Sequence, residues 1–346
     1  MILDKFIGVF SNDMAIDLGT ANTIVSVKGK GIIINEPSVV AVQRDRQGKD
    51  KILAVGQEAK RMLGKTPINI QAVRPMQDGV IADFEMTERM IRYFIEKAHS
   101  RKSFIRPRVI ICIPYGITQV ERKAVEESAL SAGAREVFLV EEPMAAAIGA
   151  GIPVSDPEGH VVVDIGGGTT EIGVTSLGGL VLCKSVKVGG DKIDRSIIEY
   201  VRQNYNLFIG ERTAETIKIQ IASASVLDPE LKIQIKGKDH SGYLSTIELG
   251  SEGIRIAIKE PLKEIASAIR SVLENMPPDL AGDVVDNGII ITGGGALIRG
   301  LDKYLTEIVK IPVRIADEPL LSVAYGTSQV LDEPGLLKII EDMKNS

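Results

Sequence analysis

Two short segments of the sequence each combine an aspartate with a glycine-rich turn and a threonine. They are Asp17-Leu-Gly19-Thr20 and Asp164-Ile-Gly-Gly-Gly-Thr169. Glycine lets backbone N–H groups approach phosphate oxygens closely, and the threonine hydroxyl adds a donor. A carboxylate beside such a turn suits Mg²⁺, which prefers oxygen ligands and keeps several waters. One copy alone is better explained as a tight hairpin turn, but two matched copies predict a triphosphate bound between the two turns.

Two common phosphate-binding patterns are excluded. The Gly-Lys-Thr run at 64–66 has Ala59 where a Walker A loop requires its first glycine. The glycines at 166–168 are followed by Glu171 in the third position of a dinucleotide fingerprint, and that segment opens a strand rather than a helix.

Three further sites are weaker signals by themselves. The run Thr292-Gly-Gly-Gly-Ala-Leu297, between a strand and a helix, would let an adenine ring lie against bare backbone. Glu215 and Lys218 share a helix face, either to bind ribose hydroxyls or as a solvated ion pair. Glu142 stands just before Pro143, where an acidic residue also simply favours a helix start.

The elements that must position these residues occur twice. Strands are expected at 14–17, 23–27 and 31–35, and the same order of strand, aspartate, Gly-Thr turn, strand, glycine turn and strand returns at 161–164, 171–175 and 180–184. Self-similarity between segments this far apart indicates a duplicated domain rather than a solenoid.

Strands and helices alternate along the rest of the chain, which indicates an α/β architecture. Further strands are expected at 109–113, 137–140, 288–292 and 312–315, with a β-rich patch over 231–249. Helices are expected at 87–99, 119–132, 192–205, 212–222, 251–275 and 296–309, and from near 319.

Length, charge and cysteine content limit the classes of function that the chain could have. The chain of 346 residues is long enough for about two domains. Its net charge of −5 disfavours a nucleic-acid-binding role, because no basic excess exists to neutralise phosphates. Cys112 and Cys183 lie in apolar stretches and are expected to be reduced core thiols. The sequence shows no transmembrane span and no secretory signal.

Together these segments resemble the superfamily of actin, sugar kinases and Hsp70, and within it the MreB family of bacterial actin homologues. The resemblance covers essentially the whole chain. It rests on the segments 16–23, 35–38, 74–83, 142–149, 164–171 and 292–296.

The resemblance implies an actin-like ATPase fold, with two duplicated ribonuclease-H-like domains around a nucleotide cleft. The four expected subdomains are IA (1–33, 73–150 and 317–346), IB (34–72), IIA (151–184 and 245–316) and IIB (185–244).

The resemblance also assigns roles to individual residues, with ATP or ADP and Mg²⁺ as the implied cofactors. Asp17 and Asp164 match the carboxylates around Mg²⁺, Glu142 matches the water-positioning acid, and Thr169 its partner at the γ-phosphate. The nucleotide-binding residues are then Gly19, Thr20, Ala21 and Asn22; Gly166, Gly167, Gly168 and Thr169; Glu215, Thr216, Ile217 and Lys218; and Gly293, Gly294, Gly295, Ala296 and Leu297. Slow ATP hydrolysis is expected, since phosphoryl transfer is mostly positioning and charge stabilisation.

Two segments suggest contact with a membrane surface. On a helical projection, the apolar residues at the N-terminus fall within an arc of roughly 140°. They are Ile2, Leu3, Phe6, Ile7 and Phe10. Phe104 and Ile105 are flanked by arginine and lysine, as suits an anionic surface, and also resemble the membrane-insertion loop of the family. Packing of the first segment on the core, and a strand entry at the second, remain alternatives.

The resemblance alone implies filaments made of copies of the chain, at the inner face of the cell membrane and in the cytoplasm. The implied partners are the membrane surface and the cell-wall elongation machinery, with a role in rod shape. A soluble small-molecule kinase of the same superfamily is the first alternative. An Hsp70-like chaperone is the second, although no C-terminal peptide-binding domain is visible.

Overall fold

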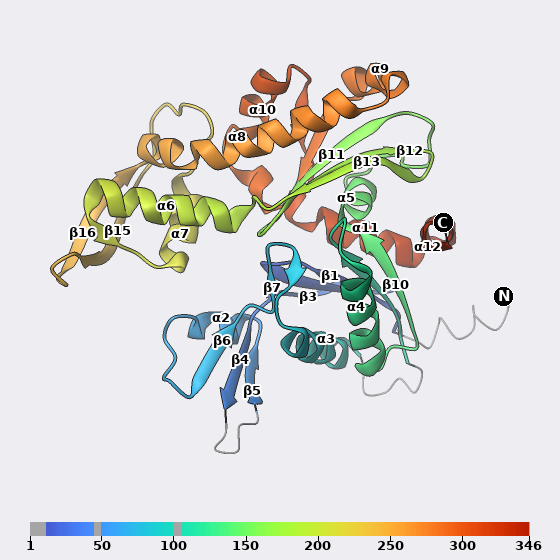
Figure 1. Cartoon of the computed structure of the whole chain (residues 1–346), viewed down its shortest axis with the longest axis horizontal. Coiled ribbons are helices and arrows are strands. Elements are labelled where there is room, and N and C mark those ends of the chain that lie inside the picture. Colours follow the sequence, from blue (N-terminus) through green and yellow to red (C-terminus); the bar gives the residue numbers. More distant parts are fainter. Residues whose placement is uncertain (1–11, 45–49, 100–105, 346) are drawn as a thin grey trace. The chain divides into compact units, whose positions relative to one another are not determined.

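The computed structural model describes residues 12–44, 50–99 and 106–345 (Figure 1). The chain divides into two compact units. Unit 1 comprises Met1–Asp156, Leu177–Gly179 and Leu321–Ser346, and unit 2 comprises Pro157–Ser176 and Leu180–Leu320.

Unit 1 is built on a five-stranded sheet in the order β10-β9-β1-β2-β3. Strand β1 pairs in parallel with β9, which pairs in parallel with β10, whereas β1-β2 and β2-β3 are antiparallel. The strands are β1 (Met14–Leu18), β2 (Asn22–Val27), β3 (Gly31–Pro37), β9 (Arg108–Ile113) and β10 (Glu136–Glu141).

Helices bury both faces of this sheet. Met90, Ile91 and Phe94 of α3 and Val125 of α4 join the apolar core. Helix α11 packs on α5 and contacts β1 and β9. The helices are α3 (Phe84–Ala98), α4 (Gln119–Ser131), α5 (Glu142–Gly149), α11 (Ser322–Asp332) and α12 (Pro334–Asn345).

A smaller sheet in unit 1 has the order β5-β4-β6, and a separate two-stranded hairpin follows it. The elements are β4 (Val40–Arg44), β5 (Asp50–Val55), α2 (Gln57–Met62), β6 (Ile70–Val73), β7 (Met76–Gln77) and β8 (Val80–Ile81).

Unit 2 repeats the topology of the large sheet. Its order is β13-β12-β11-β17-β18, with β11 antiparallel to β12 and parallel to β17, and β17 parallel to β18. The strands are β11 (His160–Ile165), β12 (Thr170–Ser176), β13 (Gly179–Val186), β17 (Ile289–Thr292) and β18 (Val313–Ile315). Because β1 and β11 take the same place in equivalent sheets, the predicted duplication is confirmed.

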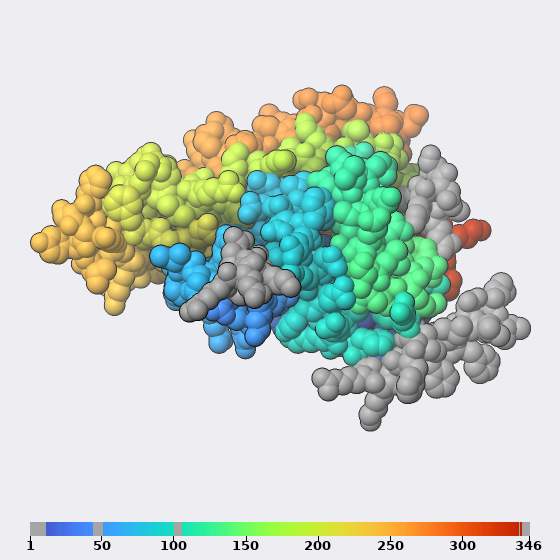
Figure 2. Space-filling model, turned by 60° about the horizontal axis from the view of Figure 1, so that its bottom comes forward, coloured from blue at the N-terminus to red at the C-terminus, as the bar shows by residue number. Residues whose placement is uncertain are grey.

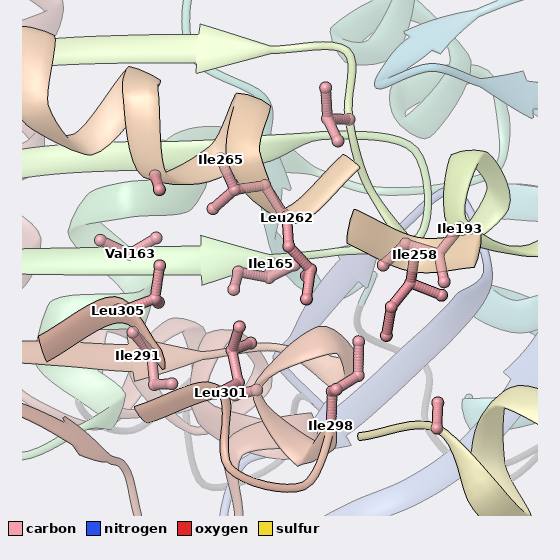
Figure 3. Packing of buried hydrophobic residues seen from close by; sticks show 14 of the residues in the cluster. Val163, Ile165, Ile193, Ile258, Leu262, Ile265, Ile291, Ile298, Leu301 and Leu305 are labelled. Atoms are coloured by element: carbon pink, nitrogen blue, oxygen red, sulfur yellow. The ribbon is translucent and has the colours of Figure 1, made fainter. Parts of the chain in front are cut away.

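The core of unit 2 lies between this sheet and its helices. Figure 3 shows Val163 and Ile165 of β11 gathered with apolar side chains of α6, α8, β17 and α10. The helices are α6 (Gly190–Tyr205), α7 (Glu211–Ile221), α8 (Ser251–Asn275), α9 (Pro278–Asn287) and α10 (Leu301–Val309).

A three-stranded sheet completes unit 2, in the order β14-β15-β16. Its strands are β14 (Leu207–Phe208), β15 (Lys232–Asp239) and β16 (Leu244–Gly250). The hairpin of β15 and β16 projects from the rest of its unit (Figures 1 and 2). Tyr243 and Leu244 at its tip are 74% and 90% exposed.

Three sequence-based expectations need correction. The predicted helix 296–309 is instead a 3-10 turn, Gly294–Leu297, followed by α10, because Gly300 takes a φ of 68° and breaks the helical path. Helix α9 was not predicted, because the proline pair at its start reads as a stop signal. Pro278 stands at its first position, where a missing N–H costs nothing. Cys183 is only partly buried, unlike the fully buried Cys112.

Within the described ranges, every helix is too short or too polar to cross a membrane.

Candidate nucleotide site

The predicted phosphate loop of unit 2 is held from behind by helix α6. Gly190 and Asp191, the first residues of α6, donate their backbone N–H groups to the carbonyls of Gly166 (3.0 Å) and Gly167 (2.8 Å). In a trans peptide the C=O and the following N–H point in opposite directions. The N–H groups of Gly167 and Gly168 therefore point away from α6, and are suited to receive an anion.

Gly189 makes this packing possible, and sequence reasoning missed it. A Cβ at this position would lie 2.6 Å from the carbonyl oxygen of Gly167 and 2.7 Å from that of Gly166. Only glycine allows the backbone to approach so closely. The Thr170 hydroxyl adds a second tie by donating to the carbonyl of Val188 at 2.6 Å. The run Val188-Gly189-Gly190 after β13 was the available sequence signal.

Asp164 lies at the end of β11, opposite Thr292 at the end of β17. Its carboxylate accepts a 2.7 Å hydrogen bond from the Thr292 hydroxyl. Burial raises the pKa of the Asp164 carboxyl to about 6, although the Thr292 hydrogen bond opposes the shift. Burial disfavours the charged form of this carboxyl group, and a cation bound beside it would favour the charged form again.

The predicted base-binding turn packs directly against the start of the phosphate loop. Gly293 has a φ of 77° and donates its N–H to the carbonyl of Pro319 at 2.8 Å. A Cβ on Gly295 would lie 2.2 Å from Cγ2 of Ile165. Gly294 is exposed and has no side chain. The turn thus presents bare backbone, as the sequence predicts.

Lys218 does not project into solvent. Its ammonium group donates to Oδ2 of Asp194 (2.9 Å) and to the carbonyl of Gly190 (3.1 Å), and the Lys218 side chain is 18% exposed. Burial raises the pKa of Asp194 to about 6; Lys218 opposes that shift, while Glu215 and Asp191 add to it. Asp194 is a second residue that sequence reasoning missed, since its partner lies 24 positions away.

These bonds link the predicted phosphate, ribose and base segments of unit 2. The phosphate loop bonds to α6, α6 bonds to α7 through Lys218, and Asp164 bonds to Thr292 at the start of the base-binding turn. Three segments that are remote in the sequence therefore belong to one hydrogen-bonded assembly.

The turn between β1 and β2 in unit 1 is held in a similar way by Ser38, the last residue of the 35–38 segment, to which sequence reasoning assigned no role. The Ser38 hydroxyl donates to the carbonyl of Gly19 at 2.6 Å, and its N–H donates to that of Ala21 at 3.0 Å. By the same peptide geometry, the N–H of Thr20 points away from Ser38. The Thr20 hydroxyl accepts the N–H of Gly79 at 3.3 Å.

The remaining predicted polar residues lie at strand or helix boundaries. Asp17 is in β1, and Glu142 is the first residue of α5, 9% exposed and followed by Pro143. The helix dipole favours an acid at this position. Thr169 is 7% exposed in unit 2.

The predicted nucleotide-site residues divide between the two units. Asp17, Glu142 and the 19–22 turn belong to unit 1, and the other predicted nucleotide-site residues belong to unit 2. The membrane-contact residues at 2–10 and 104–105 lie outside the described residues.

Comparison with known proteins assigns a family. A family model described as MreB/Mbl protein matches residues 11–339. The chain is 55% identical over 335 residues to the cell shape-determining protein MreB of Escherichia coli strain K12, covering 96% of each chain. It is 50% identical over 325 residues to the cell shape-determining protein Mbl of Bacillus subtilis strain 168, covering 94% of this chain and 97% of Mbl.

Solved structures agree with the sequence comparison. The crystal structure of MreB5 of Spiroplasma citri bound to ADP has a TM-score of 0.88 and 38% identity, covering 96% of this chain and 98% of MreB5. Its AMPPNP-bound form also has a TM-score of 0.88 and 38% identity, covering 95% and 98%. The MamK double helical filament, at 22% identity and a TM-score of 0.78 over 93% of this chain and 99% of MamK, supports the fold alone.

Proposed function

Because the chain belongs to the MreB/Mbl family and has its actin-like fold, we propose that it is an ATP-binding cytoskeletal protein that helps to determine cell shape. The observation that carries this proposal is the hydrogen-bonded assembly of phosphate, ribose and base segments in unit 2. It occurs in a chain whose 38% identical relative was solved with ADP and with AMPPNP.

The proposed nucleotide contacts divide by part of the ligand. Gly19–Asn22 and Gly166–Thr169 would bind phosphates, 215–218 the ribose, and 293–297 the adenine. The supporting feature is that backbone carbonyls of both phosphate turns accept hydrogen bonds from neighbouring segments. The N–H groups of the same peptides therefore point away from those segments and could bind phosphate. The four subdomains IA, IB, IIA and IIB, with the boundaries given above, are proposed as the frame for these contacts.

Mg²⁺ fits the donors that the chain offers. Magnesium is usually held by one or two carboxylates together with substrate phosphates and water. Asp17 and Asp164 would supply these carboxylates. Burial raises the pKa of Asp164, and a bound cation would offset the cost of burying its charged carboxylate. When bound, the ion would neutralise charge on the phosphate oxygens.

Hydrolysis is proposed to depend on Glu142 and Thr169. Glu142 is a buried carboxylate fixed at the first turn of α5, so it can accept a hydrogen bond from a water and orient it. The water would attack the γ-phosphorus, and the bond to the bridging oxygen would break to give ADP and phosphate. Slow turnover of this kind would accompany filament turnover.

Single-turnover hydrolysis with matched binding measurements tests this role. Glu142→Gln keeps the size of the side chain but removes its charge. We expect hydrolysis to slow by about a hundredfold while the Kd for ATP stays unchanged. Unchanged hydrolysis in the variant would leave Glu142 with only its helix-start role.

Self-assembly into filaments is proposed from the family and from exposed apolar side chains on regular helices. Val120 on α4 is 74% exposed, and Ile256 on α8 is 67% exposed. Each is a proposed contact with another copy of the chain. The wall-elongation machinery is proposed as a further partner, on the basis of family membership alone.

Peripheral attachment to the inner face of the cell membrane is proposed from the amphipathic segment 2–10 and the pair Phe104-Ile105. Each contact is weak for one subunit, but a polymer presents many copies together. Liposome pelleting with and without residues 1–10 tests the first segment. Loss of pelleting on deletion is expected, and equal binding by both forms would exclude it as the anchor.

The alternative of a soluble small-molecule kinase makes a different prediction. A kinase would turn over ATP faster when its acceptor is added, whereas this proposal expects no effect of added sugars on the rate of hydrolysis.

A further inference from the structure

Arg299 connects the segment after the base-binding turn to the end of helix α7. Its guanidinium Nη1 lies 3.3 Å from the carbonyl oxygen of Ile219 and 3.4 Å from that of Ala222. The last carbonyls of a helix have no partner within the helix, and the helix dipole favours a cation beside them. Arg299 therefore holds the C-terminal end of α7.

The backbone strengthens the same junction. Ser223 and Arg299 form an isolated parallel bridge, and Ala224 donates its N–H to the Arg299 carbonyl at 2.8 Å. The fully buried Ser223 hydroxyl lies 2.6 Å from the carbonyl oxygen of Ser225 and 3.1 Å from that of Arg299. Gly300 fits closely here, since a Cβ on it would lie 1.9 Å from Oγ of Ser225.

This junction lies between two of the proposed nucleotide contacts. Residues 215–218 are on α7, about one turn before its end. The turn 293–297 precedes Arg299, and Ile298 donates its N–H to the Gly295 carbonyl at 3.1 Å. The Ile298 side chain is anchored in the core (Figure 3). The spacing between the ribose and base contacts is therefore set at this junction.

We propose that Arg299 is a positioning residue for the nucleoside half of the site. It fixes α7 relative to the 293–297 turn and acts through these two elements. The inference rests on the nucleotide-binding role proposed above, and it predicts a selective defect: binding of the nucleoside weakens while binding of the phosphates does not.

The chain offers a matched control. Arg270 donates through Nη2 to the carbonyl of Ile308 near the end of α10, at 2.6 Å, which is the same kind of bond in the same unit but away from the proposed contacts. The variants are Arg299→Ala, Arg299→Lys and Arg270→Ala. For each, we would measure the Kd of MgATP, MgADP and inorganic tripolyphosphate with Mg²⁺, together with the melting temperature.

We expect Arg299→Ala to raise the Kd of ATP and ADP by about tenfold and to leave the Kd of tripolyphosphate unchanged. Arg299→Lys should recover most of this loss, because an ammonium group can also bind helix-terminal carbonyls. Arg270→Ala should change no Kd.

Three outcomes would overturn the inference. In the first, Arg299→Ala changes no Kd, as expected for Arg270→Ala. In the second, it raises the Kd of ATP and of tripolyphosphate equally, which would indicate a general structural role. If the wild-type chain bound tripolyphosphate but no adenine nucleotide, both the inference and the proposed ATP site would fail. ATP binding by the wild type without the selective defect would reject the inference alone.

Discussion

Replacing Gly189 with alanine tests how the phosphate loop of unit 2 is held. Gly189 is the N-cap of α6, and its backbone is extended, so alanine can adopt the same conformation. The new Cβ would lie 2.6 Å from the carbonyl oxygen of Gly167. An ordinary contact begins near 3.4 Å, so the loop and α6 must separate by about 0.8 Å.

That separation weakens two backbone hydrogen bonds, from Gly190 to Gly166 (3.0 Å) and from Asp191 to Gly167 (2.8 Å). At about 1 kcal/mol net for each bond, the free energy of unfolding should fall by roughly 2 kcal/mol. The phosphate-binding N–H groups move with the loop, so the Kd for ATP should rise by about tenfold or more.

Gly210→Ala is the matched control. Gly210 is the N-cap of α7, also has an extended backbone, and a Cβ there would meet nothing within 4 Å. Both variants lose the same N-cap preference for glycine over alanine, so their difference isolates the clash. Urea denaturation followed by circular dichroism measures stability, and calorimetric titration measures ATP binding. Equal stability and equal Kd for the two variants would refute the packing argument.

Two further predictions concern stability. Gly326→Ala places a Cβ 1.9 Å from the carbonyl oxygen of Ala145, where α11 packs on α5, and should lower the free energy of unfolding by about 3 kcal/mol in urea denaturation. In the control Gly335→Ala on α12, the new Cβ meets nothing within 4 Å, so the free energy of unfolding should not fall. Similar losses of stability in both variants would show that the α5–α11 contact is looser than described. Because burial raises the pKa of Asp194 from 3.8 to about 6 despite Lys218, the folded state holds this proton more tightly, and the free energy of unfolding falls as pH rises from about 4 to about 7. Asp194→Asn removes this contribution, so its stability relative to wild type should rise by up to about 3 kcal/mol across that window, and a constant difference would contradict the shift.

Local sequence patterns predicted much of the fold. The Asp-Gly-Thr turns depend on neighbouring residues, and their repetition identified the two equivalent sheets. Helix α8 also matched its predicted bounds of 251–275, because its apolar periodicity persists through Pro261. In both cases the determining interactions lie within a few residues of one another.

Long-range contacts explain what the sequence did not predict. Gly189 matters only because α6 folds back on the phosphate loop, some twenty residues earlier in the chain. Glu215 and Lys218 were correctly placed on one helix, yet Lys218 bonds to Asp194 on another. Arg299 has no motif of its own, and its partners lie on α7. No local spacing encodes these pairs, so only the folded structure reveals them.

Sedimentation with and without ATP, followed by electron microscopy of the pellet, tests the central claim most directly. A nucleotide-binding cytoskeletal protein of this family should form filaments that pellet when MgATP is present above a threshold protein concentration. Soluble monomers under all nucleotide and lipid conditions would contradict the cytoskeletal role.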